Sequence, residues 1–220
     1  MTWVKICGMT NLEDALTAVE AGADAVGFVF YEKSPRNIPV EAARRIIEKL
    51  PEGVEKVGVF VNEPPERVSA VADDVGLTAV QFHGDEYENP EKYAISLKAF
   101  FCLPAAETIQ KWKNSVFFTF QHFPNLAGVM LDSGTREARG GTGKTFAWGE
   151  AHGFVKTTGT LHPVVIAGGL TPGNVEWAVG FLSPWGVDVA SGVEARPGKK
   201  DPEKVRAFVK AVREADRKAS

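Results

Sequence analysis

The chain has 220 residues, of which 44% are hydrophobic and 24% are charged, a composition typical of soluble globular proteins. Its formal net charge of −3 argues against a broad basic surface for nucleic acid or an anionic membrane, although a few local donors could still bind a small anion. Eight strand–helix units would average 27.5 residues (220/8), about what a short strand, a three-turn helix and two loops need.

Short apolar runs along the chain predict eight strands. They cover residues 3–7, 25–30, 57–61, 79–83, 95–100, 128–132, 164–167 and 187–190. Several of these runs are apolar almost throughout, as expected of parallel strands that are covered on both faces.

Amphipathic runs between the strands predict helices. They cover residues 12–22, 40–50, 66–76, 105–113, 172–182 and 203–217. Asn11 is a predicted N-cap, and Gly22 a predicted end, of the first helix. Residues 114–125 are aromatic-rich and fit a strand, a short helix or an insertion, while the glycines of residues 146–161 predict a short or irregular helix.

This alternation predicts parallel strands joined by right-handed helical crossovers. An open doubly wound sheet and a closed barrel both fit it, and the count of eight favours an α/β fold of the (βα)8 TIM-barrel type. Because no linker, low-complexity tract or charge block divides the chain, we expect residues 1–220 to form a single domain.

Active sites of such barrels lie at the carboxyl ends of the strands. In the first strand, side-chain alternation turns Lys5 and Cys7 towards the barrel interior, where Lys5 would lower the pKa of the Cys7 thiol. The alternative is a small buried cysteine above a snorkelling lysine. In the sixth strand the same alternation turns Asp132 towards the barrel mouth, as a general acid or base or as a cap for the following turn.

Two glycine turns follow the last two strands. Gly168-Gly169 and Ser191-Gly192 predict a phosphate cradle, because bare glycines let an anion approach backbone N–H groups; the alternative is a pair of ordinary tight turns. Residues 140–145 (GGTGKT) resemble a P-loop, but Ala138 stands where that motif needs glycine, so we expect a mobile loop over the site.

Other polar positions are less specific. The planar fork of Arg36 could bind a substrate carboxylate or simply be solvated. His83 could contact a ligand or satisfy a buried turn, and Cys102 is predicted to pack in the core.

Two cysteines exclude a disulfide framework and a four-thiolate zinc site, and no two of the four histidines have i, i+4 spacing. These counts therefore give no sign of a disulfide framework or of these two kinds of zinc site. The amino terminus lacks the pattern of a signal peptide, and the longest stretches without charged residues contain Pro, Gly, His, Asn or Gln. We expect a cytoplasmic protein without a membrane helix.

Together these residues resemble the phosphoribosylanthranilate isomerase family of tryptophan biosynthesis. The matching segments include Lys5-Ile6-Cys7-Gly8-Met9-Thr10, Ser34-Pro35-Arg36, Gln81-Phe82-His83-Gly84, Leu131-Asp132-Ser133, Ala167-Gly168-Gly169-Leu170, residues 188–194 (DVASGVE) and Pro197-Gly198-Lys199-Lys200-Asp201. They span nearly the whole chain in the expected order. The sequence departs from the family pattern at Ala147 and Ala190.

The resemblance implies an enzyme that converts N-(5-phosphoribosyl)anthranilate to 1-(2-carboxyphenylamino)-1-deoxyribulose 5-phosphate by an Amadori rearrangement, without metal or cofactor. The family's general base corresponds to Cys7, its general acid to Asp132 and its carboxylate-binding arginine to Arg36. Its phosphate site corresponds to Gly168, Gly169, Ser191 and Gly192, with Asp188 nearby. A monomer and a homodimer are both compatible with the sequence.

Three other functions compete with this interpretation. A histidine-pathway sugar isomerase would have paired aspartates, whereas the first strand here ends in Cys7. An indole-3-glycerol-phosphate synthase would have lysine and glutamate at strand ends, for which Lys98 is the available lysine. A non-catalytic phosphate binder would keep the glycine cradle without bringing Cys7 and Asp132 to one cavity.

Overall fold

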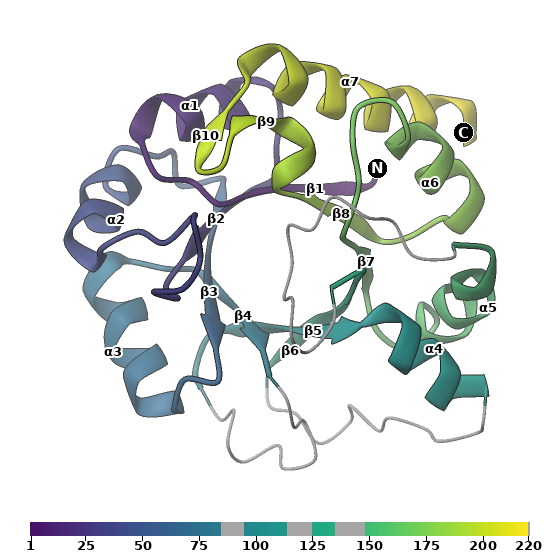
Figure 1. The fold of residues 1–220 in the computed structure, drawn as a ribbon, viewed down its shortest axis with the longest axis horizontal. Helices are drawn as coiled ribbons and strands as arrows, with labels where there is room; N and C mark the ends of the chain where they lie inside the picture. Colours follow the sequence, from purple (N-terminus) through teal and green to yellow (C-terminus); the bar gives the residue numbers. More distant parts are fainter. Residues whose placement is uncertain (85–94, 114–124, 135–147, 220) are drawn as a thin grey trace.

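The computed structural model describes residues 1–84, 95–113, 125–134 and 148–219. Eight parallel strands form a closed barrel in chain order, with β8 paired to β1 (Figure 1). The strands are β1 (Trp3–Cys7), β2 (Ala25–Val29), β3 (Glu55–Val61), β4 (Ala79–His83), β5 (Lys98–Pro104), β6 (Leu126–Asp132), β7 (Val164–Ile166) and β8 (Gly186–Val189). The predicted (βα)8 barrel is confirmed.

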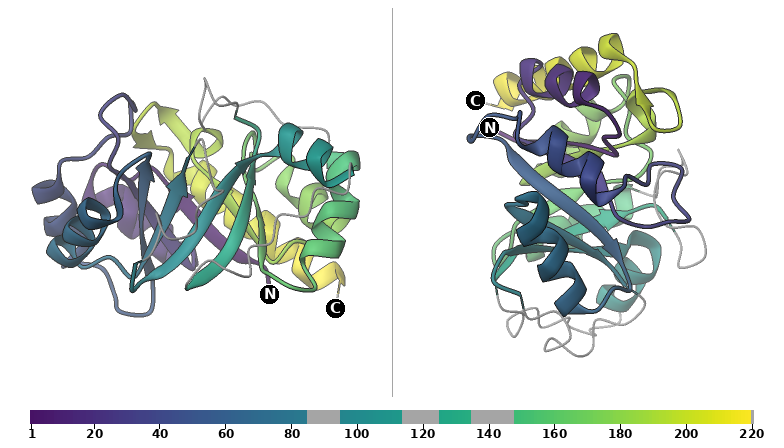
Figure 2. Two further views of the ribbon diagram at one scale, coloured as in Figure 1. Left: turned by 90° about the horizontal axis from the view of Figure 1, so that it is seen from below. Right: turned by 90° about the vertical axis from the view of Figure 1, so that its left-hand side faces the viewer.

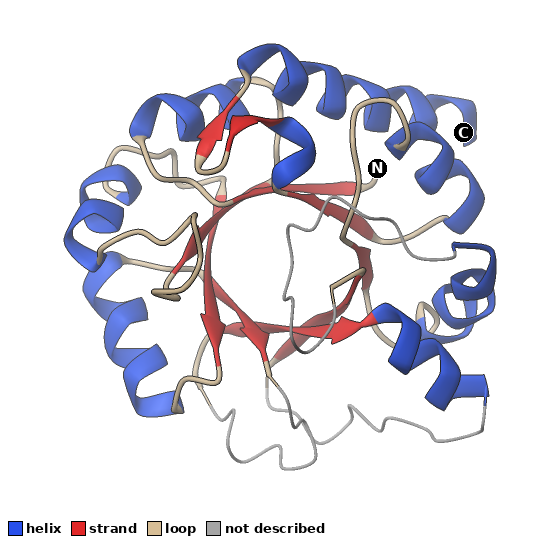
Figure 3. Ribbon diagram, viewed as in Figure 1, coloured by secondary structure: helices blue, strands red, loops and turns tan. Residues whose placement is uncertain are grey.

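Helices surround this inner ring of strands (Figure 3). In the described residues they are α1 (Leu12–Glu20), α2 (Val40–Ile47), α3 (Pro65–Val75), α4 (Ala105–Lys113), α5 (Trp148–Thr158), α6 (Val175–Leu182) and α7 (Pro202–Ala219). The Asn11 side chain accepts a hydrogen bond from Asp14 N at 2.9 Å, so the predicted cap of α1 is confirmed. None of the described helices is long and apolar enough to cross a membrane.

A short segment after β8 was not predicted as structure. It contains the 3₁₀ helix η3 (Ser191–Val193) and an antiparallel hairpin of β9 (Glu194–Arg196) and β10 (Lys199–Lys200). The hairpin lies next to α1 on the rim of the barrel (Figure 1), where Lys200 N donates to Asp14 Oδ2 at 2.7 Å. The two termini lie close together (Figure 2), and Thr2 N donates to the Asp216 carboxylate.

Predicted and observed bounds differ by a few residues in several elements, and the two clearest differences are in β5 and α5. The fifth strand is Lys98–Pro104 rather than residues 95–100, because side-chain alternation continues past Phe100: Cys102 turns into the barrel and Leu103 turns out. Helix α5 is a regular helix of 11 residues. Its Gly153 permits close packing, since a Cβ there would lie 2.8 Å from the Trp112 ring. Residues 114–124 and the GGTGKT segment lie outside the described residues.

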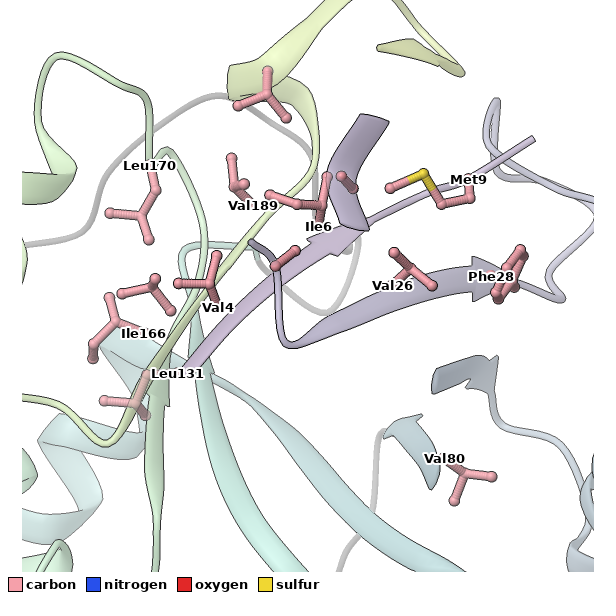
Figure 4. Close-up of a cluster of buried hydrophobic side chains, with 14 of the residues drawn as sticks. Val4, Ile6, Met9, Val26, Phe28, Val80, Leu131, Ile166, Leu170 and Val189 are labelled. Atoms are coloured by element: carbon pink, nitrogen blue, oxygen red, sulfur yellow. The ribbon is translucent and has the colours of Figure 1, made fainter. Parts of the chain in front are cut away.

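The core has an outer and an inner part. Between strands and helices lie the outward side chains, among them Val4, Ile6 and Leu131 (Figure 4). Inside the barrel, Trp3 stacks on Phe100 with ring centroids 5.4 Å apart, near the amino ends of the strands. Apolar side chains thus fill the barrel near the amino ends of its strands.

Candidate active site

A cavity of about 280 Å³, including space open to solvent, lies at the carboxyl ends of β6, β7 and β8. Six of the nine predicted site residues line it, together with Leu170, Val189 and Ala190: they are Asp132, Gly168, Gly169, Asp188, Ser191 and Gly192. Cys7, Arg36 and His83 do not line this cavity. Cys7 and His83 are nevertheless the last residues of β1 and β4, so they lie at the same end of the barrel.

Asp132 lies at the cavity and also caps the turn that follows β6. Its carboxylate lines the cavity, and its Oδ1 accepts a hydrogen bond of 2.6 Å from Gly134 N. Burial raises the pKa of Asp132 above its ordinary value; the Gly134 hydrogen bond opposes this, while the charge of Asp188 adds to it. The site therefore favours a protonated carboxyl more than water does.

Cys7 points into the barrel as predicted, and it packs with Val29 and Val59. The expected fall in the pKa of its thiol is wrong in direction. Burial raises the pKa of the Cys7 thiol, and the charge of Asp188 raises it further. These effects exceed the lowering of the pKa by the charge of Lys5. Gly27 on β2 provides the room for the sulfur, since a Cβ there would lie 2.7 Å from Cys7 Sγ.

We expect the Cys7 thiolate to form at a higher pH than that of an ordinary cysteine. The test is the ultraviolet absorbance of the thiolate as a function of pH in a Cys102→Ala background. The same protein in denaturant provides the reference, with a cysteine pKa of about 8.5. A folded-state titration below the denatured one would contradict the dominance of burial.

A buried polar chain crosses the barrel below the site. Lys5 is fully buried, and its Nζ donates to Asp188 Oδ1 and Gln81 Oε1, both at 2.9 Å. Gln81 Nε2 lies 2.7 Å from His83 Nε2. The cavity residue Asp188 is thereby connected through Lys5 and Gln81 to His83, the last residue of β4.

The two glycine turns pack against neighbouring backbone too closely for a side chain. Gly168 and Gly169 have φ of 78° and 68°. A Cβ on Gly168 would meet Ser133 Oγ, and one on Gly192 would lie 1.8 Å from Leu170 O. In the described part of the chain, the buried Ser133 Oγ has no hydrogen-bond partner. These contacts explain why both turns require glycine.

Replacing Gly192 by Ala is therefore expected to weaken binding of inorganic phosphate by about tenfold or more, because the added methyl forces the two turns apart. Calorimetry with phosphate measures this loss. Gly180→Ala is the matched control, since a Cβ at Gly180 has open space around it. Equal phosphate affinity in the two variants would contradict the assignment of the cradle.

Arg36 is neither solvated nor in the cavity lining. Its Nε and Nη2 donate to Glu194 Oε1 and Oε2 at 2.8 and 2.7 Å. The side chain lies over Gly8, where a Cβ would be 2.6 Å from Arg36 Cδ. Because Gly8 follows Cys7 directly, the guanidinium lies beside the mouth of the barrel.

Several residues of the site could not be assigned from the sequence. Glu194 and Lys200 lie on the hairpin after β8, and Asn174 fixes the Gly169 turn by donating to Gly169 O at 3.0 Å. Gly27 could have been noticed because a glycine inside an apolar strand often marks a position that another group approaches closely. The described residues contain no group of three or more His, Cys, Asp or Glu side chains placed to hold a metal ion.

A closed barrel with polar residues and glycine turns at the carboxyl ends of its strands defines a (βα)8-barrel enzyme. Residues 4–211 match the family model of N-(5′-phosphoribosyl)anthranilate (PRA) isomerase. The isomerase of Geotalea uraniireducens is 47% identical over 213 residues, covering 96% of this chain and 98% of that protein. The chain belongs to the N-(5′-phosphoribosyl)anthranilate isomerase family, whose members act in tryptophan biosynthesis.

Solved structures agree with this assignment. The isomerase of Thermotoga maritima is 43% identical to this chain and superposes with a TM-score of 0.83. The match covers 97% of this chain and 100% of that protein. A related isomerase structure, 41% identical with a TM-score of 0.80 and covering 97% of this chain and 100% of its own, contains reduced 1-(o-carboxyphenylamino)-1-deoxyribulose 5-phosphate. A further Thermotoga maritima structure describes monomers generated from a dimeric enzyme.

Proposed function

We propose that this isomerase converts N-(5′-phosphoribosyl)anthranilate to 1-(2-carboxyphenylamino)-1-deoxyribulose 5-phosphate by an Amadori rearrangement, with Asp132 as general acid and Cys7 as general base. The observation that carries the proposal is that Cys7 and Asp132 end two strands of one barrel, at the same end as the cavity with its two glycine turns. The reduced product analogue held by the related isomerase supports the same ligand class.

In this proposal the substrate phosphate binds at Gly168, Gly169, Ser191 and Gly192, where backbone N–H groups can approach an anion. The anthranilate carboxylate binds to Arg36 by charge-assisted hydrogen bonds. The residues of the proposed site come from the ends of strands between β1 and β8. In this proposal, residues 1–220 therefore act as one catalytic domain.

The first chemical step opens the ribose ring. Asp132 donates a proton to the furanose oxygen, the bond between that oxygen and C1′ breaks, and the nitrogen lone pair forms a Schiff-base cation at C1′. The raised pKa of Asp132 supports this role, because it keeps the proton available closer to neutral pH.

The second step removes a proton from carbon. The Cys7 thiolate takes the C2′ proton, the C2′–H electron pair forms a C1′=C2′ bond, and the cation is neutralised to an enolamine. Protonation at C1′ and loss of the hydroxyl proton at C2′ then give the ketone. Although burial raises the pKa of Cys7, the nearby Schiff-base cation would favour the thiolate when it is needed.

The competing functions receive less support. Lys98 lies at the amino end of β5, pairs with Glu55 at 2.7 Å and is exposed, so it is remote from the cavity at the opposite end. A binder without catalysis would not require Cys7 and Asp132 at one end of the barrel.

The test is incubation of the purified protein with N-(5′-phosphoribosyl)anthranilate, followed by product identification. We expect loss of substrate fluorescence with formation of the ketose phosphate and without indole-ring closure. Indole formation, or a rate equal to that of spontaneous decay, would contradict the proposal.

A further inference from the structure

We propose that Lys200, acting through Glu194, is a positioning residue that keeps a net positive charge at Arg36 and so makes the site select a ligand whose aromatic ring carries a carboxylate. This inference rests on the proposed function, since it concerns how the same site recognises the anthranilate group. Neither Lys200 nor Glu194 is expected to touch the reacting atoms.

The first observation is the way in which Glu194 binds Arg36. The carboxylate uses the Nε and Nη2 edge of the guanidinium, with two hydrogen bonds of 2.8 and 2.7 Å. A guanidinium has five N–H donors in a fixed plane, so the edge formed by Nη1 and Nη2 can still bind a second carboxylate side by side. Glu194 therefore holds Arg36 in one orientation while leaving it a recognition edge.

The second observation is the charge balance. Glu194 alone would neutralise Arg36 and remove its attraction for a substrate carboxylate. Lys200 Nζ lies 3.1 Å from Glu194 Oε1, and both side chains are almost fully buried, at 0% and 4% exposed. Two cations and one anion leave a net charge of +1 beside the mouth of the barrel. Buried charges are weakly screened, so this surplus acts on an incoming anion.

The third observation is that the cluster is fixed to the site on two sides. Lys200 Nζ also donates to the carbonyl oxygen of Ala190, which lines the cavity, at 3.0 Å. On the other side, Thr10 Oγ1 donates to Gly198 O at 2.5 Å, which joins the hairpin of β9 and β10 to the loop after Cys7. The hairpin thus lies between the cavity and the loop after β1, the strand that carries the proposed base Cys7.

The experiment compares two reduced product analogues, one with the ring carboxylate and one without it, by calorimetry. The wild-type protein is expected to prefer the carboxylated analogue. Lys200→Met should reduce that preference by about tenfold, mostly through weaker binding of the carboxylated analogue. Lys199→Met is the matched control, because the adjacent Lys199 pairs with Glu13 and Asp14 instead and should leave the preference unchanged.

The double variant Glu194→Gln/Lys200→Met separates charge from shape. It restores a net charge of +1 on Arg36, so the preference should return towards the wild-type value. An equal loss for both analogues in Lys200→Met, or no recovery in the double variant, would overturn the inference while leaving the proposed function intact. Failure of the wild-type protein to bind either analogue would overturn the proposed function instead. Lys200→Gln provides a second neutral variant if Lys200→Met does not fold.

Discussion

Replacing Asp132 by Asn is expected to lower turnover of N-(5′-phosphoribosyl)anthranilate by about 10²–10⁴-fold while the reduced product analogue still binds. The amide oxygen can accept the hydrogen bond that Gly134 N now donates to Asp132 Oδ1, so the turn after β6 keeps its shape. The variant loses the proton that the ring oxygen needs. Steady-state fluorescence gives the rate, and calorimetry gives the affinity for the analogue.

Asp201→Asn is the matched control for this prediction. Asp201 also accepts backbone hydrogen bonds, from Glu203 N and Lys204 N at the start of α7, but it is not among the residues that line the cavity. Its variant should retain turnover within about a factor of two. Turnover by Asp132→Asn at the level of this control would show that Asp132 is not the general acid.

Replacing Lys5 by Met is expected to lower the free energy of unfolding by about 3–5 kcal/mol, because it leaves the Asp188 carboxylate buried without its cation. Lys5 is fully buried and pairs with Asp188 at 2.9 Å. Urea unfolding followed by circular dichroism measures the change. The double variant Lys5→Met/Asp188→Asn should recover part of the loss, since it removes both charges.

Lys98→Met provides the comparison for Lys5→Met. Lys98 also lies on a strand and pairs with a carboxylate, Glu55, but its side chain is 65% exposed. Its loss should change the free energy of unfolding by less than about 1 kcal/mol. Equal effects of the two lysine substitutions would contradict the structural role of the buried pair.

The sequence was sufficient to predict which side chains face the barrel mouth. Strict alternation along β1 and β6 separates Val4 and Ile6 from Cys7, and Leu131 from Asp132. That pattern follows from backbone geometry and needs no knowledge of distant residues. The two glycine turns could also be recognised, because glycines that follow apolar strands directly are an unusual local signal.

Properties that depend on distant residues were not predicted. The pKa of Cys7 rises because the folded barrel buries its sulfur, whereas the sequence showed only the neighbouring Lys5. Arg36 pairs with Glu194, 158 positions away along the chain, and Lys200 joins them from a short hairpin without a hydrophobic pattern. Long-range ion pairs leave no local periodicity from which they could be inferred.

The most direct test of the proposed chemistry is the rate of fluorescence loss from N-(5′-phosphoribosyl)anthranilate with wild-type protein, with Cys7→Ala and with Cys102→Ala. Cys102 is buried deeper in the barrel, where it packs with apolar residues, and serves as the matched cysteine control. We predict rapid turnover by the wild-type protein and Cys102→Ala, and a rate about 10²–10⁴-fold lower for Cys7→Ala with retained analogue binding. Near-wild-type turnover by Cys7→Ala would contradict the assignment of Cys7 as the general base.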